Sequence, residues 1–69
     1  GNTLTIHVEG LNEVAEITLY NTVGQKVFEG VLEPAKIAGY SVDMKHYSRG
    51  HYMIKLQGKK THSLQRVIY

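Results

Sequence analysis

Histidine, cysteine and the carboxylates are the side chains that most often bind metals, and the chain contains four histidines, six carboxylates and no cysteine. It contains no cysteine, so neither a thiolate metal site nor a disulfide can form. Its four histidines are His7, His46, His51 and His62. They lack the close spacing on one face that a metal site requires. The sequence therefore predicts no metal site.

The sequence also lacks the arrangements of side chains that catalysis requires. Ser41, Ser48 and Ser63 have no nucleophile-elbow motif around them, and no pair of carboxylates marks a recognisable cleft. A chain of 69 residues also offers little interior in which burial could shift a pKa. We therefore predict that the chain is not an enzyme and needs no cofactor.

Five tyrosines raise the alternative of a stacking platform for sugars or nucleic acid. Tyr20, Tyr40 and Tyr52 occupy strand positions at which packing is expected, which leaves Tyr47 and Tyr69 freer. The formal net charge of +2 is spread along the chain without a basic block, so it indicates no nucleic-acid partner.

The elements that must position these side chains are predicted to be strands of one small domain, residues 1–69. The clearest pattern is a hairpin in which Ile17 and Leu19 alternate with polar or aromatic neighbours. Asn21 to Gly24 then reverses the chain, because both residue types tolerate a positive φ. Residues 25–29 return as the second strand of the hairpin.

Four further strands follow from period-2 alternation. They are expected at residues 3–8, 37–44, 51–56 and 61–69. Pro34 places a loop or an edge before the fourth strand, and Gly30 is expected to mark a bulge or the end of the third. The alternation in residues 61–69 leaves open which face of the last strand is buried.

Six strand patterns without a helical period predict an all-β fold, a small antiparallel Ig-like β-sandwich of six to seven strands. A chain of this size buries only about 60% of its unfolded surface, so the core must be small. The expected core residues are Leu4, Ile6, Val8, Ile17, Leu19, Val27, Tyr40, Val42, Tyr52, Ile54 and Leu56.

Three segments occur in the order and spacing of a known family. They are residues 17–27, residues 43–56, in which a polar connector leads to a Gly-x-Tyr strand, and residues 65–69. Together they resemble the type A C-terminal sorting domain of type IX secretion cargo, the family that includes the gingipain tails. The resemblance covers nearly the whole chain.

The resemblance implies a secretion signal. In that family an Ig-like sandwich follows a cargo protein that has reached the periplasm by a separate N-terminal signal, and it directs the cargo through the outer membrane. A sortase-like protease usually removes the domain and joins the cargo to anionic lipopolysaccharide, although some members keep it. The implied partners are translocon and sortase components and anionic lipopolysaccharide. The implied location is the periplasm in transit, then the cell surface or the medium.

The resemblance also assigns residues. Gly24 and Gln25 match the first family motif, and Gly50 and Tyr52 match the second. The terminal motif, which the translocon is expected to recognise, is Arg66, Val67, Ile68 and Tyr69. The family usually has lysine where this chain has arginine, which keeps the charge and changes the geometry. A purely structural role of Gly24 and Gly50 in turns does not exclude a role in recognition, because a recognition domain also needs turns.

One departure concerns the beginning of the chain. The Asn-Pro segment that precedes the first strand in the family is missing, because Gly1 to Thr3 begins almost on that strand. This leaves room upstream for the cleavage region and one N-terminal strand, so the domain as given is expected to be truncated there. The residues do not decide whether the domain is cleaved.

The last strand suggests how recognition would work. Residues 61–69 offer an extended segment with Arg66 and a terminal carboxylate, which a receptor could add to a sheet. The same edge could pair two copies into a strand-exchanged dimer.

Two other functions fit the same fold. A fibronectin-III-like or carbohydrate-binding module of a secreted protein would carry a row of exposed aromatic side chains on one sheet face. An inert stalk domain would lose no function on removal of its last residues.

Overall fold

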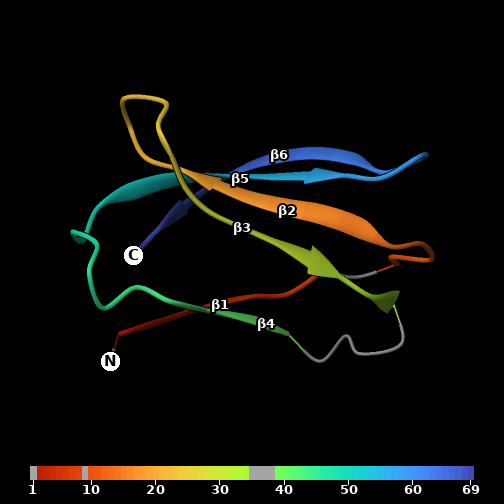
Figure 1. Ribbon diagram of the computed structural model, residues 1–69, viewed down its shortest axis with the longest axis horizontal. Coiled ribbons are helices and arrows are strands. Elements are labelled where there is room, and N and C mark those ends of the chain that lie inside the picture. Colours follow the sequence, from red (N-terminus) through yellow and green to blue (C-terminus); the bar gives the residue numbers. More distant parts are fainter. Residues whose placement is uncertain (1, 9, 35–38) are drawn as a thin grey trace.

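The computed structural model describes residues 2–8, 10–34 and 39–69, which form strands and their connectors (Figure 1). The strands are β1 (Thr3–Ile6), β2 (Ala15–Tyr20), β3 (Lys26–Leu32), β4 (Tyr40–Asp43), β5 (His51–Gln57) and β6 (His62–Ile68). No helix within these described ranges is long and apolar enough to cross a membrane. The predicted all-β class is confirmed.

The strands form two antiparallel sheets. One sheet has four strands in the order β3-β2-β5-β6, and the other consists of β1 paired with β4. Figure 1 shows them as two layers, with β1 and β4 below the four-stranded sheet. This arrangement confirms the predicted small Ig-like sandwich, with six strands in the described part of the chain.

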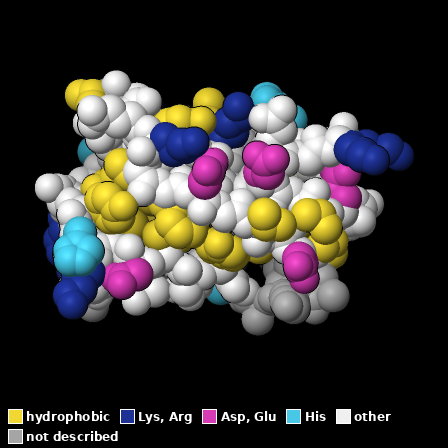
Figure 2. Space-filling view, in the orientation of Figure 1, with side chains coloured by type: hydrophobic (Ala, Val, Ile, Leu, Met, Phe, Trp, Pro, Cys, Tyr) yellow, Lys and Arg dark blue, Asp and Glu magenta, His cyan; other side chains and the backbone are white. Residues whose placement is uncertain are grey.

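The core lies between the two layers and draws on alternate residues of the strands. Its buried hydrophobic members are Ile6, Ala15, Ile17, Leu19, Leu32, Val42, Met44, Tyr52, Ile54 and Leu56. Four other expected core residues, Leu4, Val8, Val27 and Tyr40, are half-buried and pack against this cluster. Figure 2 shows hydrophobic side chains in a band along the middle of the molecule, with charged side chains on both sides of it.

β3 continues beyond its predicted end. The expectation of a bulge or strand end at Gly30 is wrong, because Gly30 pairs in register with Ile17 and β3 runs on to Leu32. Packing explains this glycine, since a Cβ atom there would overlap the Tyr40 hydroxyl and approach the Phe28 ring to 3.4 Å.

The irregularity of the hairpin lies closer to the turn. Leu19 pairs with Phe28, whereas the next residue, Tyr20, pairs with Lys26, so Val27 is the additional residue of a β-bulge. Bulges disturb an edge strand and hinder its pairing with another chain. β3 is such an edge strand.

β4 is shorter than predicted and begins at Tyr40. Residues 37 and 38, which were included in the predicted strand, lie outside the described residues. Met44 follows β4 and is fully buried, and its backbone N–H donates to the Asn2 carbonyl at 2.7 Å. Pro34 lies in the connector after β3, as predicted.

β6 is the strand that the second sheet covers least. It forms the edge opposite β3, and all of its residues are exposed except Val67, which is half-buried. The ambiguity in the sequence pattern thus has a physical basis, because neither face of β6 packs fully into the core.

Candidate functional site

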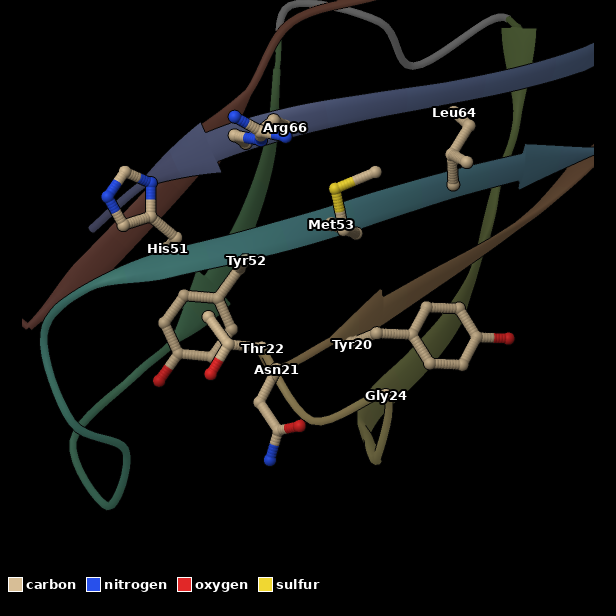
Figure 3. Close-up of a pocket in the computed structure, with 9 residues that line it drawn as sticks. All are labelled: Tyr20, Asn21, Thr22, Gly24, His51, Tyr52, Met53, Leu64 and Arg66. Carbon is tan, nitrogen blue, oxygen red and sulfur yellow. The ribbon is translucent and has the colours of Figure 1, made fainter.

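The three sequence segments singled out by their order meet at one end of the sandwich. On adjacent strands, Tyr52 pairs with Val67. Beyond the end of β6, Gly50 and Tyr69 exchange both backbone hydrogen bonds, with N···O distances of 3.1 and 2.8 Å. The turn at residues 21–24 lies beside Tyr52, and together they line one hollow (Figure 3). Segments distant in sequence therefore form one continuous surface.

Asn21 organises the turn between β2 and β3. Its Oδ1 accepts hydrogen bonds from the backbone N–H of Val23 at 3.1 Å and of Gln25 at 2.9 Å, and its Nδ2 donates to Gln25 Oε1 at 2.9 Å. The N–H of Gly24 donates to the Asn21 carbonyl, and Gly24 has a φ of 85°, which glycine adopts without steric strain. Gly24 and Gln25 therefore have a structural role in this turn.

Two tyrosine hydroxyls fix the connector between β4 and β5. The hydroxyl of the buried Tyr52 donates to the Ser48 carbonyl, and Tyr47 donates to the Val27 carbonyl at 2.7 Å. The bond from Tyr47 ties the connector to β3, the strand that follows the turn at residues 21–24. Gly50 ends the connector with a φ of 148°. Gly50 and Tyr52 thus help to shape the loop that adjoins the turn.

The four terminal-motif residues alternate between the two faces of the sheet. Val67 lies opposite the core residue Tyr52 and is half-buried, as is Tyr69. Arg66 and Ile68 lie on the outer face and are exposed, Ile68 by 71%. The Tyr69 ring is covered by a cation, since the Arg49 guanidinium carbon lies 4.7 Å from its centroid.

A hollow of about 550 Å³ occupies the outer face beside this motif. Its floor is a row across three adjacent strands, in which Met53 pairs with Tyr20 on one side and with Arg66 on the other. Figure 3 shows this row together with Leu64, which precedes Arg66 on β6, and His51, the first residue of β5. The described residues that line the hollow include no carboxylate.

The outer edge of β6 presents unpaired backbone groups. In an antiparallel ladder, hydrogen-bonded and non-hydrogen-bonded pairs alternate. Because Gly50 and Tyr69 form a hydrogen-bonded pair, every second residue back along β6 also turns its backbone toward β5. The N–H and C=O groups of Leu64, Arg66 and Ile68 therefore point away from the sheet, where no described strand meets them.

A separate polar contact fastens the opposite end of the sandwich. The Glu13 carboxylate accepts hydrogen bonds from the Thr61 hydroxyl at 2.7 Å and from the Lys60 backbone N–H at 2.8 Å. The bonds from Thr61 and then Lys60 hold the pKa of Glu13 below its ordinary value. This contact ties the β1–β2 connector to the turn between β5 and β6.

Sequence reasoning missed the contacts of Asn21, Tyr47 and Arg49. Asn21 was expected in the turn for its tolerance of a positive φ, but no described residue other than glycine has a positive φ, and Asn21 acts through its side chain. Asn21 carried a signal, because an asparagine three residues before a glycine favours a side-chain-capped turn. The contacts of Tyr47 and Arg49 depend on residues 20 positions away in sequence, so no local pattern indicates them. The described residues contain no group of three or more histidine or acidic side chains that could hold a metal.

Comparison with protein families gave a match over the whole chain. The family model described as the secretion system C-terminal sorting domain matches residues 1–69. Searches of curated proteins and of solved structures gave no match.

Proposed function

The chain belongs to the family of secretion system C-terminal sorting domains, and we propose that its terminal strand is the part that the secretion machinery reads. Membership of this family implies a sorting signal of type IX secretion that brings a cargo to the cell surface or the medium. The family is not a catalytic one, and we propose that this domain has no catalytic activity. The secretion machinery is accordingly its partner. The proposal adds the recognised residues, Arg66, Val67, Ile68 and Tyr69.

The observation that carries the proposal is the free edge of β6. Unlike β3, the other edge of the sheet, β6 has no bulge among its pairs with β5, and it contains neither proline nor an acidic residue. Natural proteins commonly protect such edges with bulges, prolines or charged side chains, and of these β6 carries only the charge of Arg66. A regular edge without bulge or proline is suited to accept a strand from another protein.

The proposal extends to the finer features that the resemblance implies. The domain is of type A, spans residues 1–69 as a single unit, and acts after its cargo has reached the periplasm. A sortase-like protease removes the domain and joins the cargo to anionic lipopolysaccharide. The order of the three motif segments and their close packing at one end of the sandwich support this assignment.

The carbohydrate-binding alternative receives no comparable support. Tyr47 is the only aromatic residue among the large hydrophobic side chains that are exposed in the described ranges, so these ranges carry no row of exposed rings. The outer sheet face instead mixes charged, apolar and polar side chains.

The experiment is an export assay with a periplasm-directed fluorescent reporter fused to residues 1–69 in a type IX-competent cell. We expect the surface and medium fractions to disappear when residues 66–69 are deleted. Protease resistance of the periplasmic fusion controls for folding. Unchanged export after the deletion would overturn the proposed role of these residues. Absence of export by both fusions, with export restored by the native upstream segment, would show that the signal needs that segment.

A further inference from the structure

Arg66 carries a positive charge at the free edge of β6 and has no acidic partner among the described residues. It is exposed, and no carboxylate of the described residues forms an ion pair with it. The hollow on the outer face of the sheet lies next to Arg66, and its lining includes Tyr20, Met53 and Leu64. None of the described residues that line it is acidic. An arginine so placed can bind a planar carboxylate of another molecule by donating two parallel hydrogen bonds to it.

The geometry of β6 fixes where that carboxylate would have to be. Leu64, Arg66 and Ile68 turn their unpaired backbone groups outward, and their side chains share the outer face. In an added antiparallel strand, a residue directly opposite each of them would place its side chain on that same face. Leu64 and Ile68 are exposed by 62% and 71%, so their new neighbours should be apolar.

We propose that the docked partner is an extended segment of the secretion machinery with the pattern apolar–any–acidic–any–apolar, bound antiparallel along β6 with its acidic side chain on Arg66. This inference rests on the proposed function, since it names the chemistry of the segment that reads the terminal strand. The backbone hydrogen bonds supply sequence-independent affinity. The charge at Arg66, together with the apolar contacts at Leu64 and Ile68, selects the segment.

A second copy of the chain fits the edge less well. No side chain of β6 is acidic, so a register that places Arg66 opposite Arg66 in two paired β6 strands brings two like charges together. Val27, Glu29 and Val31 of β3 have the required pattern. However, Val27 is the bulged residue, and Glu29 is already paired with Lys26 at 3.2 Å. Charge and register therefore favour a foreign acidic segment.

The test uses isotope-labelled protein of residues 1–69 and two synthetic peptides. One peptide has the core Val-Thr-Glu-Thr-Val, and the other has lysine in place of the glutamate. We expect the glutamate peptide to bind about tenfold more tightly than the lysine peptide. The largest amide shifts should lie at residues 62–68. Equal affinity for the two peptides, shifts confined to other strands, or binding of neither peptide would overturn the proposal.

Charge reversal in the protein provides the matched control. Arg66→Glu should exchange the preference, so that the lysine peptide becomes the tighter ligand. Lys45→Glu makes the same change of net charge on the exposed β4–β5 connector and should leave the preference unchanged. If both variants weaken the glutamate peptide equally, binding reflects net charge alone and the proposed pairing is wrong.

Two competing occupants are separate outcomes. Concentration-dependent shifts along β6 without peptide would identify a second copy as the occupant. Vesicles containing anionic lipopolysaccharide that displace the glutamate peptide and perturb the same residues would identify a membrane surface. Either result would overturn the proposal that an acidic segment of the secretion machinery binds β6.

The export assay separates this inference from the function on which it rests. We expect Arg66→Glu to reduce the exported fraction severalfold relative to Lys45→Glu. Loss of export on deletion of residues 66–69, with full export of Arg66→Glu, would overturn the acidic segment and leave the proposed function intact. Unchanged export of both the deletion variant and Arg66→Glu would overturn the acidic segment and the proposed function together.

Discussion

Proline substitutions at two neighbouring positions of β6 test which backbone groups are free. Leu64 turns its N–H away from the sheet, whereas the next residue, Gln65, forms a hydrogen-bonded pair with Ile54. Proline has no backbone N–H and is tolerated in an edge strand where that group faces solvent. Leu64→Pro should therefore fold, and Gln65→Pro should be strongly destabilised.

The expected difference follows from the hydrogen bonds that each substitution removes. Gln65→Pro eliminates one ladder bond, with a net contribution of about 0.5–1.5 kcal/mol, and leaves the Ile54 carbonyl without that partner, which costs about 1–3 kcal/mol more. Leu64→Pro removes no ladder bond, and the side chain it replaces is already 62% exposed. We expect Gln65→Pro to be roughly 2–4 kcal/mol less stable than Leu64→Pro.

Urea denaturation followed by circular dichroism measures this difference, with equal slopes required for the comparison. A domain of this size has a total stability of roughly 3–10 kcal/mol, so Gln65→Pro can be largely unfolded in water. Equal midpoints for the two variants would refute the alternation assigned to β6. A less stable Leu64→Pro variant would show that the free edge belongs to the other set of residues.

Three further variants test the contacts that hold the fold. The pKa of Glu13 is lowered from the ordinary glutamate value of 4.5 by its bond to Thr61. The stabilising effect of this carboxylate is therefore complete above pH 4.5 and is lost as the pH falls through the lowered folded-state pKa. Glu13→Gln should flatten this acid dependence in urea titrations from pH 7 to 3, and an unaltered profile would contradict the assignment. Gly30→Ala should displace the end of the half-buried Tyr40 ring and destabilise the domain by about 1 kcal/mol, the low end for overpacking. The change should be seen as altered NMR signals of the Tyr40 ring and a lower urea midpoint, and unaltered ring signals would contradict the overlap. Asn21→Ala removes the side-chain hydrogen bonds of the turn and should lower the free energy of unfolding by about 1 kcal/mol. Amide exchange should increase at residues 21–25 and not in β6. Unchanged exchange at residues 21–25 would show that these hydrogen bonds are dispensable.

Local patterns were sufficient for much of the fold. The alternation around Ile17 and Leu19 and the Asn–Gly turn predicted the central hairpin, because strand pleating and positive φ are properties of neighbouring residues. Contacts between distant residues were not accessible in this way. Gly30 was misread because the reason for a glycine there is the Tyr40 ring, which packs over it from β4.

The candidate site could be predicted only in part. Its motif residues were identified by resemblance to a family, but their meeting at one end follows from the β5–β6 pairing and from the exchange of bonds between Gly50 and Tyr69. The status of β6 as a free edge had no sequence signal, since a strand exposed on both faces produces no clear alternation.

The central claim is that the free edge of β6 is read during export. The most direct measurement is the exported fraction of a periplasm-directed reporter fused to residues 1–69 with Leu64→Pro, which removes one outward N–H and should leave the fold intact. The account predicts a protease-resistant, folded domain that stays in the periplasm. Export at the unmodified level by that folded variant would contradict strand addition at this edge.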